Sequence, residues 1–218
     1  DIAAAVREYQ RCGLRVHLST WVRPDESFLT DLAGLVPLCN DLGIASLDLD
    51  TEGAWRAGGG HDWPAMATHL IAELGARGLT CPIGVNDYAS MQSCTRPLIE
   101  LADIIRPQLY SVAYVTHGKV GADGKRWTAP DSVYWPGTTQ RYGMQSGLWG
   151  GVREGKRLEI GLAAYKQDIR GWSPERAMTT CWDAAEGLGA EMVWWWSLST
   201  MTGEVGAAVR RLTARLKK

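Results

Sequence analysis

At positions 47–52 the chain reads LDLDTE, directly after the short apolar run GIASL at 43–47. Successive side chains of an extended strand point to opposite faces, so Asp48, Asp50 and Glu52 are expected to share one face. Three carboxylates on one face repel one another and resist desolvation, which a purely structural strand does not favour. A solvent-exposed strand face is the simpler interpretation. We favour a row of catalytic carboxylates at the carboxyl end of a barrel strand.

Strand and helix patterns alternate on both sides of this stretch. Strands are predicted at 14–21, 79–85, 104–110, 158–164 and 192–196, and helices at 1–12, 26–42, 62–77, 95–102, 174–187 and 204–217. Three residues are suited to cap helix starts, namely Asp25, Asp62 and Ser173. No glycine-rich phosphate-binding motif follows any predicted strand. We therefore predict an α/β fold, a (β/α) TIM-type barrel with about six recognisable βα units, about two short of the usual eight.

The length of 218 residues suits one sizeable core, so we expect a single domain over 1–218. Residues 115–156 interrupt the alternation as a long insertion rich in Trp and Tyr. Loops of this length are usually functional or disordered, and the aromatic content argues against disorder. Whether this insertion covers a cleft as a lid stays open at this level.

Composition narrows the class of function. The formal net charge of −1 argues against nucleic-acid binding. The 11 Trp residues are typical of sugar-binding clefts, because an indole offers a flat apolar face and one donor, although Trp also serves in cores. The five Cys form no CxxC pair, so we expect buried free thiols rather than a disulfide framework or a zinc site.

Targeting signals are sparse. No apolar run reaches about 18 residues, so no membrane span is expected, and no signal peptide is visible. The chain starts at Asp1 without Met, and we expect either a processed chain or a domain of a longer protein.

Residues 45–52, ASLDLDTE, resemble the DGxDxDxE signature of family 18 glycoside hydrolases, the chitinase group, with Ala45 and Ser46 in place of its first Asp and Gly. Two later segments add to the resemblance in the family's order. Gln108 to Ser111 resembles the sixth-strand segment, and Met192 to Ser197 resembles the eighth. Family 25 lysozymes and other peptidoglycan-cleaving barrels of phage endolysins are similar in their Asp-x-Glu pair.

The resemblance implies a role for each matched residue. Glu52 is the general acid, and Asp50 orients the N-acetyl group whose carbonyl oxygen attacks the anomeric carbon. Tyr110 hydrogen-bonds that carbonyl, and the eighth-strand segment with Trp194 and Trp196 supplies the Trp that forms the floor of the sugar subsite. The family's first two strands then precede Asp1 or are absent.

The residues support similar chemistry without the family. Glycoside hydrolysis needs a carboxylic acid to protonate the leaving oxygen and a second group to stabilise the positive charge that develops. An Asp50 anion would raise the pKa of Glu52, and Asp48 could share a proton with Asp50 and so adjust its pKa. Asp48, Asp50 and Glu52 could instead hold a divalent cation, completed by Asn86 or Asp87, although the row contains no His.

Other candidate residues have simpler interpretations beside the functional one. Substrate contacts are predicted at Tyr110, Gln108, Trp194, Trp196, Asn86 and Asp87. Tyr110 could fill the barrel, and turn chemistry explains Asn-Asp equally well. Trp194 and Trp196 share a strand face and Trp195 takes the other, so at least one of these residues is expected in the core.

We therefore predict a glycosidase that cleaves β-1,4 bonds in an N-acetylhexosamine polymer, with peptidoglycan favoured slightly over chitin. A non-catalytic, chitinase-like lectin barrel is the alternative. No cofactor and no metal are expected, the chain is expected to be a monomer, and its action is expected on the cell wall or outside the cell. The terminal helix carries Arg210, Arg211 and Arg215, which form a solvated face or attract an anionic envelope.

Overall fold

The computed structural model describes residues 2–56, 60–88, 94–110, 155–164, 173–196 and 202–217. Six strands in these ranges form one sheet whose order follows the chain, β1-β2-β3-β4-β5-β6. They are β1 (His17–Trp21), β2 (Ser46–Asp50), β3 (Ile83–Tyr88), β4 (Ile104–Leu109), β5 (Arg157–Ala163) and β6 (Met192–Trp196). The pairs β1–β2, β2–β3 and β5–β6 are parallel.

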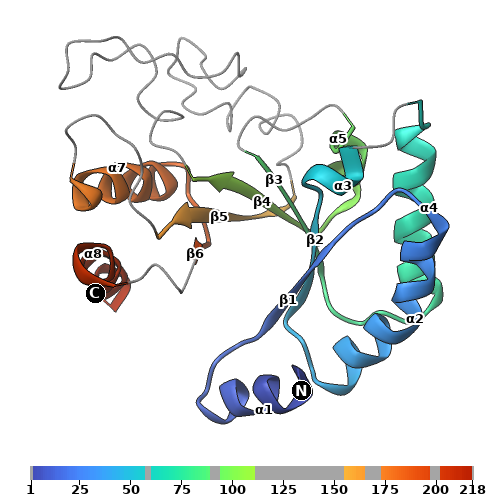
Figure 1. Ribbon diagram of the computed structural model, residues 1–218, viewed down its shortest axis with the longest axis horizontal. Helices are drawn as coiled ribbons and strands as arrows, with labels where there is room; N and C mark the ends of the chain where they lie inside the picture. The colour runs from blue at the N-terminus through green and yellow to red at the C-terminus, as the bar shows by residue number, and fades with distance from the viewer. Residues whose placement is uncertain are drawn as a thin grey trace. The chain divides into compact units, whose positions relative to one another are not determined.

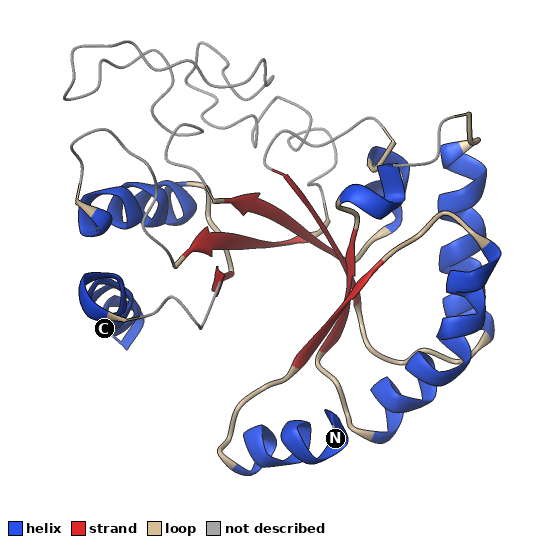
Figure 2. Cartoon of the chain, in the orientation of Figure 1, coloured by secondary structure: helices blue, strands red, loops and turns tan. Residues whose placement is uncertain are grey.

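Helices alternate with these strands (Figures 1 and 2). They are α1 (Ile2–Arg11), α2 (Glu26–Asp41), α3 (Gly53–Arg56), α4 (Trp63–Ala76), α5 (Arg96–Leu101), α7 (Pro174–Gly187), α8 (Gly203–Thr213) and the 3₁₀ turn η4 (Ala214–Lys217). Sequential parallel strands with helical crossovers make an incomplete (β/α) TIM-type barrel, which confirms the predicted fold class. None of the described helices is long and apolar enough to cross a membrane.

The chain divides into two compact units, residues 1–87 with 91–105, and residues 88–90 with 106–218. The prediction of a single domain stays a prediction. The insertion predicted at 115–156 lies outside the described residues, apart from its last two.

In the first unit, apolar residues of β2 and of its flanking helices build the core. Leu47 and Leu49 on β2, Leu32 on α2 and Leu74 on α4 are fully buried. Both helices begin as predicted, because the Asp25 side chain accepts the Phe28 N–H and the Asp62 side chain accepts the Ala65 N–H, each at 3.1 Å.

In the second unit, α7 is the helix on which the other elements pack. Its start is capped by Ser173, which accepts the Arg176 N–H at 3.2 Å. Trp182 stacks on Trp195 of β6, with ring centroids 5.7 Å apart. Ion pairs tie α7 to the C-terminal helical segment: Glu175 pairs with Arg211 at 2.7 Å, and Arg215 pairs with Asp183 at 3.0 Å and with Glu186 at 3.3 Å.

A buried ion pair links β4 and β5 within this unit. Arg106 donates from Nε and Nη2 to one oxygen of Glu159, at 2.7 and 2.6 Å, and both side chains are at most 5% exposed. Buried charges are tolerated when paired and hydrogen-bonded in this way, which explains how β4 is buried along its whole length despite its polar residues.

Some boundaries differ from those predicted. β3 starts at Ile83 rather than 79, because the Asn40 side chain bonds to Gly78 and Thr80 and holds that segment as a loop. β1 starts at His17 rather than 14, since the Leu14 N–H is bonded to the Tyr9 carbonyl at the end of α1. The predicted last helix ends as a 3₁₀ turn.

None of the five cysteines forms a disulfide, and only Cys39 and Cys181 are buried. Cys12 is exposed and the remaining two are partly buried.

Candidate active site

The acid row lies on a face of the sheet where β1 and β2 pair side chains that can hydrogen-bond at every second register position. His17 pairs with Ser46, Ser19 with Asp48, and Trp21 with Asp50. His17 Nδ1 and Ser46 Oγ are hydrogen-bonded at 2.6 Å, and Ser19 Oγ donates to Asp48 Oδ2 at 3.2 Å. A side-chain hydrogen bond joins Trp21 to Asp50, and the indole N–H is the only donor that the Trp21 side chain has.

Asp48 is the deepest carboxylate of the row, with only 6% of its surface exposed. The same oxygen that accepts from Ser19 also accepts from Asn86 Nδ2 at 2.5 Å. Asn86, on the neighbouring β3, is itself buried and lies opposite Asp50 in the strand register. The structure therefore brings together Asp48, Asp50 and Asn86 on one face. Strand alternation places the buried Asp87 on the other face, and its substrate contact stays a prediction.

Glu52 is not on the strand, in contrast to the expectation that all three acids share a strand face. β2 ends at Asp50, and Glu52 lies two residues later, directly before the short helix α3. The departure is fixed by Thr51, fully buried, whose hydroxyl donates to the Asn86 carbonyl at 2.8 Å. The Glu52 N–H then donates to Asp50 Oδ1 at 3.2 Å. The position of Glu52 relative to Asp50 is therefore set by this backbone hydrogen bond, not by strand alternation.

Asp50 is a carboxyl whose pKa lies above its ordinary value. Burial raises the pKa of Asp50 to about 6, and the negative charges of Glu52 and Asp48 act in the same direction. Hydrogen bonds from the Glu52 amide and the Trp21 side chain oppose that shift by stabilising the anion. Asp50 therefore changes its protonation state close to neutral pH, as groups in acid–base catalysis do.

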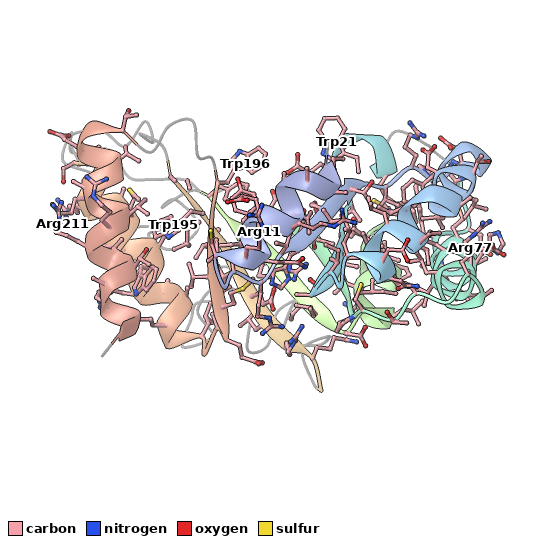
Figure 3. All side chains as sticks on the ribbon, turned by 90° about the horizontal axis from the view of Figure 1, so that it is seen from below. Arg11, Trp21, Arg77, Trp195, Trp196 and Arg211 are labelled. Carbon is pink, nitrogen blue, oxygen red and sulfur yellow. The ribbon has the colours of Figure 1, made fainter. Side chains whose placement is uncertain are left out.

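The predicted sugar-binding residues Gln108, Tyr110, Trp194 and Trp196 lie in the second unit. Tyr110 meets Trp194 edge to face, with ring centroids 5.8 Å apart. Gln108 is buried, whereas Trp196 is 57% exposed and carries a label in Figure 3. Since Trp195 packs on α7, strand alternation leaves Trp194 and Trp196 on the opposite face, as predicted.

A close contact fixes the plane of Trp194. In the register Trp194 lies beside Gly161 of β5, and a Cβ added to Gly161 would lie 2.4 Å from Trp194 Cζ2. Only a glycine permits the indole to lie across the β5 backbone. Sequence reasoning missed Gly161, although an isolated glycine within a strand pattern is a signal of close approach.

Two other features bear on the choice of site. Among the described residues, no three His, Cys, Asp or Glu side chains are grouped so as to hold a metal ion. A pocket of about 420 Å³ lies in the first unit between α2 and α4, with Phe28, Trp55 and Leu70 among its lining residues. None of the predicted site residues lines it.

Fold and site together define a (β/α) barrel with an acid row at the carboxyl end of a strand, an arrangement found in glycoside hydrolases. No family model and no curated protein matches the chain by sequence. Solved structures do match in fold.

A family GH18 chitinase from Chromobacterium violaceum aligns with a TM-score of 0.55 and 13% identity, over 95% of this chain and 68% of that one. A family 18 chitinase from Crocus vernus aligns with a TM-score of 0.58 and 10% identity, over 98% and 76%. A β-1,3-glucanosyltransferase from Rhizomucor miehei aligns with a TM-score of 0.54 and 13% identity, over 88% and 68%. At these identities the likeness shows the fold, and it is the fold that the resemblance of residues 45–52 implied.

Proposed function

We propose that this chain is a glycoside hydrolase that cleaves β-1,4 bonds in an N-acetylhexosamine polymer. The observation that carries the proposal is the pair Asp50 and Glu52 at the carboxyl end of β2, in which burial and charge raise the pKa of Asp50 to about 6. Above a pH of about 6 Asp50 is deprotonated, so the pair suits a reaction in which Glu52 protonates the leaving oxygen and the adjacent Asp50 anion stabilises the positive charge that develops.

Each carboxyl then has one task. Glu52, at the end of the row and partly exposed, donates the proton to the glycosidic oxygen. Asp50 acts as the anion that orients the substrate's acetamido group. Asp48, two residues earlier on β2 and hydrogen-bonded to Ser19 and Asn86, supports Asp50 in that role. In the second unit, Tyr110 and Trp194 contact sugar through their packed rings, with Gln108 and Trp196 beside them in sequence.

The polymer is proposed to be peptidoglycan ahead of chitin, with action at the cell wall. This preference rests on the Ala-, Gly- and Arg-rich composition. The basic terminal helix supports it only weakly. Arg211 and Arg215 are already paired with acids of α7, which offset the positive charge that would attract an anionic envelope.

The test is release of reducing ends from purified peptidoglycan and from a chitin oligomer, by the parent chain and by Glu52→Gln. We expect Glu52→Gln to lose about 100-fold or more of turnover, since it keeps the shape of the side chain but has no proton to donate. Glu191→Gln, an exposed acid before β6, serves as the matched control and is expected to leave turnover unchanged.

Two results would contradict the proposal in different ways. If Glu52→Gln kept more than about a tenth of parental turnover, Glu52 would not be the general acid. If the parent bound the oligomer but released no reducing ends from either polymer, the lectin alternative would hold instead.

A further inference from the structure

Trp21 is the most exposed large apolar side chain among the described residues, at 72%. It is the last residue of β1, and Figure 3 shows its ring projecting away from the ribbon. A single exposed apolar residue is common on protein surfaces and by itself indicates nothing. Its place in the strand register makes this one informative, because its partner in β2 is Asp50.

The indole also has a polar partner. Its side-chain hydrogen bond to Asp50 uses the single N–H of the ring, so the polar edge points to the acid and the apolar ring faces remain in solvent. The backbone supports this placement, because the Val22 N–H donates to the Asp50 carbonyl at 2.9 Å. Trp21 therefore presents a flat apolar surface beside Asp50 at the end of the acid row.

We propose that Trp21 forms a carbohydrate-binding subsite in which the exposed indole face stacks on a pyranose ring of a β-linked N-acetylhexosamine polymer next to Asp50. The proposal rests on the proposed function for its sugar class. Aromatic rings bind the apolar faces of flat partners through dispersion and desolvation. Trp21 therefore has two separable properties, a stacking face and a donor that stabilises the Asp50 anion.

Calorimetric titration with the β-1,4-linked tetrasaccharide of N-acetylglucosamine tests the stacking face. The Glu52→Gln chain is used as the parent so that the probe is not consumed. Trp21→Ala in that background is expected to weaken binding by roughly tenfold, and Trp21→Phe by less than about threefold, because phenylalanine keeps a flat ring. Tyr9→Ala, which removes another exposed aromatic ring from α1, is the matched control and is expected to leave binding unchanged.

The pH profile of kcat/KM in chains that keep Glu52 tests the donor. Trp21→Phe removes the hydrogen bond that lowers the pKa of Asp50, so the acid limb of the profile is expected to move to higher pH while binding is largely kept. A residue with only a structural role would not separate these two readouts.

The outcomes distinguish this inference from the proposed function. Unchanged affinity in Trp21→Ala, with cleavage by the parent intact, would overturn the subsite alone. Binding that depends on Trp21 without any cleavage would uphold the subsite and overturn the hydrolase. Failure of the Glu52→Gln parent to bind the tetrasaccharide would overturn the subsite as stated.

Discussion

Asp50 is the residue at which stability and the proposed chemistry oppose each other. Its folded-state pKa of about 6 lies above the ordinary value of 3.8, because burial disfavours the anion. The native state then binds more protons than the unfolded state between these two pH values, so stability falls as the pH rises through about 6. The penalty is absent below pH 3.8 and complete above the folded pKa.

Asp50→Asn should therefore stabilise the chain at neutral and higher pH. We expect a gain of about 1–3 kcal/mol in the free energy of unfolding at pH 8, shrinking towards zero near pH 4, while activity is lost. Urea titrations at the two pH values measure the difference. Asp41→Asn, at the exposed end of α2, is the control and should show no comparable dependence on pH. A variant less stable than the parent at pH 8 would contradict the burial argument.

At the same scale, the site was only partly predictable from the sequence. Alternation within LDLDTE predicted that Asp48 and Asp50 share a face, because side-chain direction along a strand is a local property. Asn86 was predicted at the site from its place at the end of the next strand, together with Asp87, which alternation puts on the other face. Alternation did not predict that the chain turns after Asp50, since the cause is a tertiary hydrogen bond from Thr51 to the backbone of β3. The same alternation in HLSTW would have placed Ser19 and Trp21 beside the acids, had the pairing of β1 with β2 been used.

At the scale of elements, Gly161 controls how β5 and β6 pack. Gly161→Ala would place a Cβ within 2.8 Å of three atoms of the Trp194 ring, so the indole must move. We expect a loss of about 1–3 kcal/mol in stability, measured by denaturation, with a change in the near-ultraviolet circular dichroism of the Trp residues.

Two further variants isolate the cause of that loss. Gly34→Ala, in the exposed middle of α2 with nothing within 4 Å of the new Cβ, is the matched control and should stabilise the chain by about 0.5–1 kcal/mol. In a Trp194→Ala background, Gly161→Ala should cost almost nothing, since the clashing ring is gone. An equal cost with and without Trp194 would show that the backbone, rather than the ring, requires glycine.

Element types followed from the sequence more closely than element limits did. Helix starts at α2, α4 and α7 were predicted because a capping side chain bonds to a backbone N–H three residues on, which is a local interaction. The predicted start of β3 at residue 79 was wrong because the preceding loop is held by Asn40, which lies 40 residues away from Thr80 in the chain. Strand limits depend on such distant partners, and sequence pattern does not contain them.

At the scale of the whole molecule, two buried thiols can show whether the two units unfold together. Cys39 lies in the first unit and Cys181 in the second, and each is only 1% exposed. Burial, with contributions from Cys81, also raises the pKa of Cys39 to about 12, so its reactive thiolate is scarce in the native state. Neither thiol should react until the unit around it opens.

If the chain is one domain, as its length predicts, both thiols should become reactive at the same urea concentration. Pulsed alkylation at increasing urea, followed by peptide mass spectrometry, gives a midpoint for each cysteine. Cys12, exposed at the end of α1, is the internal control and should react without denaturant. Midpoints that differ by more than the error of the fits would show that the two units unfold separately. The stability changes predicted for Asp50→Asn and Gly161→Ala would then each be confined to the midpoint of one thiol, that of Cys39 for the first and that of Cys181 for the second.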